Sequence, residues 1–140
     1  MRWLGYTLAV IFVVLAAIWG VSRLAPRWQA RSLTPVMALY LDAAAAGDSA
    51  ALTRVTTSPA PVRWALLVHR EVPAFVEQAA ARVRPEGVHF NGDTAIVYFR
   101  LRKSVPDPKC VYRPLNGVWG KFVRGADSSW RILSAAFDIC

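Results

Sequence analysis

A run of twenty residues without a charged side chain, from Trp3 to Ser22, constrains this chain more than any other feature of its sequence. A helix of that length, rising about 1.5 Å per residue, measures roughly 30 Å, which is the thickness of the hydrocarbon core of a bilayer. Tryptophan and tyrosine side chains, which favour the level of the lipid headgroups, lie near the ends of the run. We therefore predict a membrane anchor over residues 1–24, a juxtamembrane linker over 25–33 and one domain over 34–140.

A cleaved secretory signal is the alternative interpretation of this run. Cleavage requires small residues at the third and first positions before the cut. Here Leu15 stands two residues before Ala17, and a cut after Ala25 would leave Pro26 beside the scissile bond. We therefore predict that the segment stays attached as one transmembrane helix, with membrane lipid as a partner of the protein.

The net charge of +8 raises the question of nucleic-acid binding. Four of the basic residues flank the apolar run, namely Arg2, Arg23, Arg27 and Arg31. The rest of the chain holds 13 basic residues against 9 acidic ones, without a helix-turn-helix pattern or an RNA motif that interleaves aromatic residues. The sequence therefore predicts no nucleic-acid partner.

One group of basic residues in the domain offers a contact for a charged partner. Arg100 and Arg102 alternate onto one side of a predicted strand, and Lys103 follows directly. Such charges ordinarily form a solvated strand face. The alternative is a functional contact. These three residues are our candidates for contact with anionic lipid headgroups or with an acidic protein partner.

The two cysteines, Cys110 and Cys140, bear on the compartment of the domain. They match no metal-ligand spacing, and an isolated pair fits a structural disulfide in an oxidising compartment. Such a bridge would close a loop of about thirty residues and stabilise the fold by roughly 3–4 kcal/mol. Two unlinked buried thiols are the alternative, and the arginine count at the two flanks leans slightly towards a cytoplasmic domain. From the cysteine pair we predict a single-pass protein of the cytoplasmic (inner) membrane, with its domain on the extracytoplasmic side.

Helical patterns occupy the first half of the domain. Thr34 and Pro35 are typical of an N-cap and a first helical residue, and Gly47 is typical of a helix C-terminus. Asp48 is suited to cap a second, short helix. A third helical stretch follows, in which Pro73 predicts a kink or a break. The apolar face of the first of these helices is predicted to hold Val36, Leu39, Tyr40 and Ala43.

Strand patterns follow Pro85. Asn91 and Gly92 between two apolar runs predict a hairpin, with alternate residues of the second strand on one face. A short strand over 110–112 and a second hairpin, over 118–124 and 129–139, complete the pattern. Helices followed by an antiparallel meander indicate the α+β class. We predict one N-terminal transmembrane helix, followed by helices packed on a curved, cone-like antiparallel sheet.

Two segments resemble the nuclear-transport-factor-2-like (cystatin-like cone) superfamily. They are the opening helix with its terminal Gly-Asp, "PVMALYLDAAAAGDSAALTRV", and the closing hairpin, "GVWGKFVRGADSSWRILSAAF". The resemblance covers about residues 34 to 140 and implies a sheet that wraps the helices into a cone with a pocket. Membrane-anchored bacterial members include lipoprotein-like domains and components of secretion machinery. Isomerase and cyclase members carry dedicated acidic or histidine residues inside the cone.

Side chains suited to acid–base chemistry are scattered along the chain: Tyr40, Asp42, His69, His89, Asp93 and Tyr98. No nucleophile elbow, phosphate loop, dinucleotide fingerprint or zinc-protease motif occurs. The two histidines are twenty residues apart and lack helical pairing, so we predict no metal site. Because no such motif occurs, we also predict no cofactor and assign no catalytic residue. The candidates for a ligand pocket are Tyr40, Trp64, His69, Tyr98 and Trp119, although packing is the ordinary role of such tryptophans.

Two classes of function follow from these observations. The first is a non-enzymatic binding or assembly module in the cell envelope, which presents its domain to another envelope protein. The second is a tethered small-molecule pocket, in the manner of isomerase-like relatives. We favour the first, because the acid–base candidates are better explained by turns and exposed strand faces.

Overall fold

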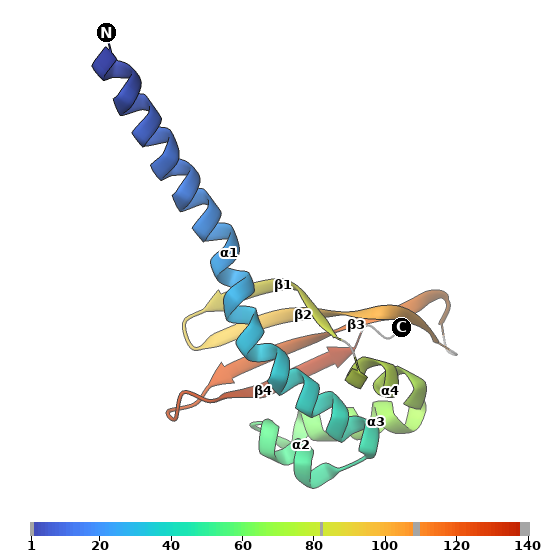
Figure 1. The fold of residues 1–140 in the computed structure, drawn as a ribbon. Helices are drawn as coiled ribbons and strands as arrows, with labels where there is room; N and C mark the ends of the chain where they lie inside the picture. Colours follow the sequence, from blue (N-terminus) through green and yellow to red (C-terminus); the bar gives the residue numbers. More distant parts are fainter. Residues whose placement is uncertain (1, 82, 108–109, 138–140) are drawn as a thin grey trace.

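Four helices precede four strands in the part of the chain that the structure describes (Figure 1). The computed structural model describes the backbone of residues 2–81, 83–107 and 110–137, and their side chains except those of 2–5, 23–27, 81, 107 and 110–114. The helices are α1 (Arg2–Ala46), α2 (Ser49–Val55), α3 (Pro59–Glu71) and α4 (Pro73–Ala81). The strands β1 (Arg84–Asn91), β2 (Thr94–Asp107), β3 (Cys110–Arg124) and β4 (Trp130–Phe137) form one antiparallel sheet in that order. The predicted α+β class, with helices packed on an antiparallel sheet, is confirmed.

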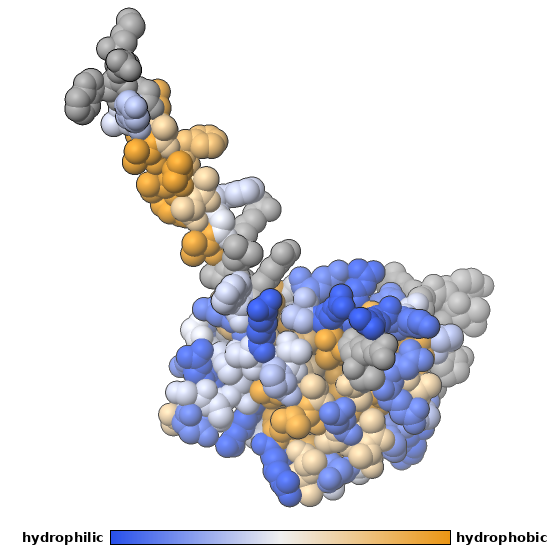
Figure 2. Space-filling view, in the orientation of Figure 1, coloured by the Kyte–Doolittle hydropathy of each residue, from blue (hydrophilic) through white to orange (hydrophobic). Residues whose placement is uncertain are grey.

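The longest element, α1, is one helix whose two parts have different surroundings. Large apolar side chains are exposed from Tyr6 to Val21, where the helix projects away from the domain (Figures 1 and 2). From Ala30 onward the helix packs into the domain and buries one stripe of residues: Ala30, Leu33, Met37, Tyr40, Leu41, Ala43 and Ala44. The same helix therefore leaves the domain and forms part of its core.

The helix start predicted at Thr34 is wrong, and the residues of the predicted linker, 25–33, are helical. Pro35 lacks the N–H that a helix interior uses, which is why the sequence favoured a helix start there. The buried side chains of Ala30 and Leu33 hold the preceding turn against the domain. The Thr34 hydroxyl also donates to the carbonyl of Ala30 at 3.1 Å. Tertiary packing thus outweighs the local preference for a break.

The predicted apolar face of α1 is confirmed in part, since Tyr40 and Ala43 are buried and Val36 packs against the core. Leu39, expected on the apolar face, is 58% exposed, whereas Met37 and Leu41 are fully buried. The sequence pattern fits both stripes because alanines and leucines occur on several sides of this helix. The position of the sheet decides between them.

No helix is both long enough and apolar enough to cross a membrane in the described part of the chain, which leaves out the side chains of residues 1–5 and 23–27. The transmembrane helix predicted over residues 1–24 is therefore not shown there.

The helix ends follow the predicted signals. Gly47, with φ of 65°, ends α1, and the N–H groups of Gly47 and Asp48 donate to the carbonyls of Ala44 and Ala43 at 3.1 and 2.9 Å. The Asp48 carboxylate then accepts from the N–H of Ala51 at 3.0 Å and caps α2. The predicted break at Pro73 is confirmed as well, since α3 ends two residues before it and α4 begins at it.

Both predicted hairpins are present. Asn91 pairs with Thr94 across a turn in which Gly92 has φ of 58°, a conformation that glycine adopts readily. Strand β3 is longer than predicted, because it runs from Cys110 through Pro114 without a break. The proline lies where the register between β2 and β3 shifts, and a proline is tolerated at such an irregularity.

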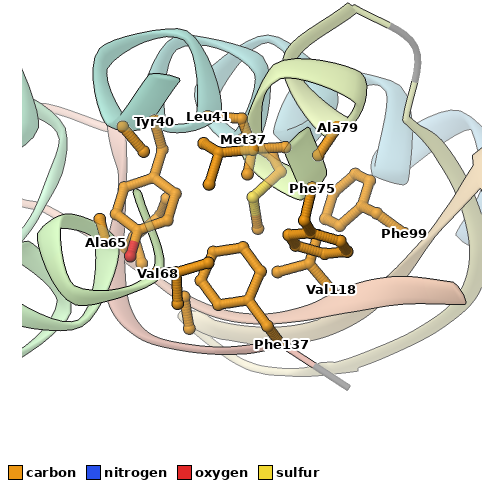
Figure 3. Packing of buried hydrophobic residues seen from close by; sticks show 14 of the residues in the cluster. Met37, Tyr40, Leu41, Ala65, Val68, Phe75, Ala79, Phe99, Val118 and Phe137 are labelled. Atoms are coloured by element: carbon orange, nitrogen blue, oxygen red, sulfur yellow. The ribbon is translucent and has the colours of Figure 1, made fainter. Parts of the chain in front are cut away.

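Side chains from the helices and the sheet meet in one core (Figure 3). The inward face of β2 supplies alternate residues, Ala95, Val97, Phe99 and Leu101, as the hairpin pattern predicted. Phe75 of α4 packs edge-on against Phe137 of β4, with ring centroids 5.1 Å apart. The core therefore joins the last strand to the last helix across the concave side of the sheet.

The predicted Cys110–Cys140 disulfide lies outside the described residues. Cys140 is not among them, and of Cys110 only the backbone is described. The bridge therefore stays a prediction.

Candidate functional site

Tyr40 is a buried residue that links two helices through a hydrogen bond. It lies on α1, is fully buried, and donates its hydroxyl proton to the carbonyl oxygen of Pro61 in α3 at 2.7 Å. Burial raises the pKa of the Tyr40 hydroxyl well above its ordinary value, because the phenolate would lose its hydration. Tyr40 is therefore held neutral as a hydrogen-bond donor and is poorly suited to act as a base.

Replacing Tyr40 by phenylalanine should lower the free energy of unfolding by about 1 kcal/mol at pH 7, since one buried hydrogen bond is lost. The raised pKa adds a pH effect. The native state holds the phenolic proton to higher pH than the unfolded chain, so this stability is complete below about pH 10 and declines as the pH rises further. Denaturant unfolding of the full chain in a mild detergent, at pH 7 and above pH 10, measures both effects. The gap between wild type and Y40F should narrow at high pH, and a gap that widens there would contradict the assignment.

Trp64 and His69 both lie on α3 but serve different contacts. The Trp64 ring is half-buried and packs against Phe137, with centroids 4.9 Å apart. His69 lies beside Gly47 at the C-terminus of α1, where a Cβ atom would come within 3.4 Å of its Nε2. Its Nδ1 is buried and has no hydrogen-bond partner among the described residues. His69 therefore packs against a helix end, and no carboxylate of the described chain pairs with it.

Tyr98 and Trp119 lie together on the other face of the sheet. They are cross-strand partners in β2 and β3, and their rings are tilted by 45° with centroids 4.8 Å apart. Neighbouring side chains along a strand point to opposite faces, so the buried Phe99 places Tyr98 outward. Trp119 is 47% exposed and Ile96 is 40% exposed on this face. We call the surface of Ile96, Tyr98 and Trp119 the outer aromatic face.

The five candidates for a ligand pocket thus divide between two sides of the sheet. Tyr40, Trp64 and His69 lie on the helix side, and Tyr98 and Trp119 lie on the outer aromatic face. Sequence reasoning missed Gly117, whose lack of a side chain leaves room for the Tyr98 ring: a Cβ atom there would lie 2.6 Å from the Tyr98 hydroxyl oxygen. The signal was present only as a glycine in a strand.

The remaining acid–base candidates stand apart from one another. Asp42 is exposed on α1, and His89 is exposed on β1. Asp93 belongs to the first hairpin turn, where its carbonyl accepts from the N–H of Arg124 at 2.8 Å. In the described residues, no group of three histidine, cysteine, aspartate or glutamate side chains is placed to hold a metal ion.

A hollowed surface with basic residues lies between α1 and the start of β1. One hollow of about 650 Å³ separates the two elements, and a second of about 490 Å³ continues from β1 onto β2; both are lined by residues 84–86. We call this continuous surface the basic groove. Its charged residues are Arg31, Arg84, Glu86, Arg100 and Arg102.

The predicted contact residues Arg100 and Arg102 therefore line the basic groove, and Lys103 follows them as an exposed residue of β2. The sequence did not predict Arg31 and Arg84 as members. Those two arginines come from a helix and an edge strand that are more than fifty residues apart in the chain, and only the fold brings them together.

Comparisons with known proteins bear on the fold. No model of a known protein family and no curated protein sequence matches the chain. Among solved structures, a protein named Rd1NTF2_05, carrying five substitutions, is 13% identical, with a TM-score of 0.50 over 78% of this chain and 96% of its own.

Two natural proteins with solved structures are similar at lower TM-scores. An NTF-2-like protein of unknown function from Silicibacter pomeroyi is 22% identical, with a TM-score of 0.47 over 80% of this chain and 96% of its own. A provisionally named ketosteroid isomerase from Shewanella frigidimarina is 12% identical, with a TM-score of 0.43 over 76% of this chain and 94% of its own. The likeness to Rd1NTF2_05, together with the helix-covered antiparallel sheet, shows that this chain has an NTF2-like fold.

Proposed function

We propose that this protein is a non-enzymatic binding or assembly module that α1 holds at a membrane. The observation that carries the proposal is the projecting part of α1. Six consecutive large apolar side chains, residues 10–15, are all exposed there, so every side of the helix is apolar and uncovered by the described chain. A helix that is apolar all round is ordinarily buried in a larger protein or in a membrane. Transfer of each such side chain from water to an apolar environment is favourable by about 1.5–3 kcal/mol.

A bilayer suits this segment better than a protein groove does. The uncharged run from Trp3 to Ser22 has the length of a bilayer's hydrocarbon core, roughly 30 Å. Trp19, 62% exposed, and Trp28, 67% exposed, lie towards the end that enters the domain, where rings of this kind favour the lipid headgroups. A groove would cover one side of the helix and leave the other in water.

The packing of the domain interior supports a binding role over a catalytic one. Apolar side chains from α1, α3, α4 and the strands converge at the place where isomerase-like relatives are expected to hold a pocket (Figure 3). Phe75, Phe99 and Phe122 are fully buried there. The tethered small-molecule pocket remains the alternative function, and the partner experiment below bears on it.

The outer aromatic face supplies the surface for a protein partner. The exposed Trp119 and the partly buried Tyr98 form a ring pair, and tryptophan and tyrosine are enriched among the residues that dominate binding energy at interfaces. We assign this face to another protein of the same envelope. We place the domain outside the cytoplasm on the basis of the cysteine pair, because a disulfide between the two cysteines would form in an oxidising compartment.

The partner is tested by cross-linking in native membranes, followed by detergent extraction and affinity purification of the full chain. Wild type should bring a stoichiometric companion of different mass, and Trp119→Ser should weaken its retention by about thirtyfold or more, as expected for a buried tryptophan at an interface. Leu67→Ser, at a leucine that is 45% exposed on α3, is the matched control and should retain the companion. A chain that emerges alone, or only with copies of itself, would contradict the proposal and strengthen the pocket alternative.

A further inference from the structure

The basic groove lies where α1 enters the domain. Among the side chains that the structure describes, Ala30 is the first fully buried one of α1 after the exposed part, and both Ala30 and Arg31 line the groove. From Ser22 to Arg31 the helix rises about 14 Å. The headgroup layer of a bilayer extends about 5–8 Å beyond the hydrocarbon. The mouth of the groove is therefore within about one Debye length, 8 Å, of the headgroups when the apolar run lies in the bilayer.

The charges that line the groove are predominantly positive. Four arginines and one glutamate line it. Arg100 pairs with Glu86, with Nη1 and Oε1 2.9 Å apart, and both side chains are about half exposed. Neither Arg84 nor Arg102 has an ion pair among the described residues. Figure 2 shows strongly hydrophilic residues around the base of the projecting helix.

The strand register brings two of these cations together. Arg84 of β1 and Arg100 of β2 are direct cross-strand partners. Like charges placed directly opposite each other destabilise a sheet, and the single carboxylate of Glu86 compensates only one of them. An anion in the groove would remove this repulsion. Arginine is suited to such a ligand, because its planar fork matches phosphate oxygens two at a time.

We infer that the basic groove binds the phosphate groups of anionic lipids at the membrane surface and so fixes the domain against the bilayer. The inference rests on the proposed membrane attachment. Two observations carry it together. The groove adjoins α1, whose exposed apolar surface suits a bilayer, and the arginines of the groove outnumber its acidic groups. Arg31, Arg84, Arg100 and Arg102 are the contact residues, with Lys103 beside them.

The test reconstitutes the full chain in phosphatidylcholine bilayers and adds spin-labelled lipids in trace amounts. The electron paramagnetic resonance spectrum then gives the relative association of phosphatidylglycerol and phosphatidylcholine with the protein. Wild type should prefer phosphatidylglycerol. Arg84→Gln combined with Arg102→Gln should lower that preference by about 25-fold, because each of the two cations contributes about fivefold in binding at an anionic surface.

Two control variants separate the groove from net charge and from folding. Arg54→Gln combined with Arg63→Gln removes two charges from exposed positions of α2 and α3 and should leave the preference unchanged. Arg84→Lys combined with Arg102→Lys keeps the charges and should retain most of the preference. Sodium chloride at 0.5 M should weaken the preference of the wild type, because it screens exposed charges.

The contrary outcomes distinguish a failure of the lipid-binding inference from a failure of the proposed membrane attachment. An unchanged preference in the glutamine variant, or an equal loss in the Arg54/Arg63 control, would overturn the inference while leaving membrane attachment intact. Inorganic phosphate that abolishes the preference, where chloride of equal ionic strength does not, would assign the groove to a soluble phosphate compound and overturn the lipid assignment. A spectrum without any lipid component immobilised by the protein would instead refute the membrane attachment of the proposed function.

Discussion

Lysine substitutions in the projecting part of α1 are expected to release the protein from membranes. Ile11 and Leu15 lie near the middle of the apolar run, 53% and 59% exposed. A lysine at the centre of a membrane helix costs about 2.5–3.5 kcal/mol, so Ile11→Lys combined with Leu15→Lys should cost about twice that. Wild type should stay in the membrane pellet after carbonate and high-salt washes and dissolve only in detergent. The double variant should appear in the supernatant, as judged by immunoblotting of the fractions.

The matched control places the same two charges on the domain. Leu39→Lys combined with Leu67→Lys changes leucines that are 58% and 45% exposed, and this variant should remain in the pellet. Wild type that is washed off without detergent would contradict the membrane attachment, and a soluble chain beginning near Pro26 would identify a cleaved signal.

The side of the membrane on which the domain lies is tested with protease. Protease added outside intact cells or spheroplasts should cleave the domain. A domain that is protected until the membrane is lysed would instead lie in the cytoplasm.

The turns and helix ends of this fold were predictable because their signals are local. Gly47 and Asp48 act through their own backbone geometry and side chain, and the structure uses both as expected. Pro73 breaks the third helical stretch for the same reason, since a proline cannot supply the N–H that a helix interior needs. The turn at Gly92 follows from the ease with which glycine adopts positive φ.

The parts that escaped prediction depend on contacts between distant segments. The sequence around Pro35 is compatible both with the start of a helix and with a proline inside a continuous helix. Only the burial of Leu33 against the domain favours the continuous helix. The pairing of Arg84 with Arg100 depends on a bulge in β1 that shifts the register between positions 85 and 87. A single sequence does not indicate where such a bulge falls, so it could not have predicted the basic groove.

The continuity of α1 gives the two proposals a common physical basis. A flexible linker would let the domain rotate freely above a bilayer, whereas a helix that is part of the core transmits its orientation to the sheet. If α1 lies in a bilayer as proposed, the basic groove would face the lipid surface, and the outer aromatic face would be held in one orientation for a partner in the same membrane.

Replacing Phe75 by alanine is expected to lower the free energy of unfolding by about 3–5 kcal/mol. Phe75 is fully buried on α4, and its ring packs edge-on against Phe137 at the centre of the core (Figure 3). Truncation removes the transfer free energy of the ring and leaves a cavity that rigid neighbours on the sheet fill only in part. A domain of this size has a total stability of about 5–15 kcal/mol, so the variant should be close to unfolding. Urea denaturation of the full chain in mild detergent, followed by tryptophan fluorescence, measures the change.

Two further variants show whether the interior is filled, as the non-enzymatic proposal supposes. Phe75→Leu keeps most of the volume and should cost less than about 1.5 kcal/mol if the core repacks around it. Leu67→Ala, at a leucine that is 45% exposed on α3, should change stability by about 0.5 kcal/mol or less. If Phe75→Ala cost as little as Leu67→Ala, the ring would border a space already open to solvent. The pocket alternative would then gain over the binding module, because a cavity that tolerates loss of its wall is one that a ligand can occupy.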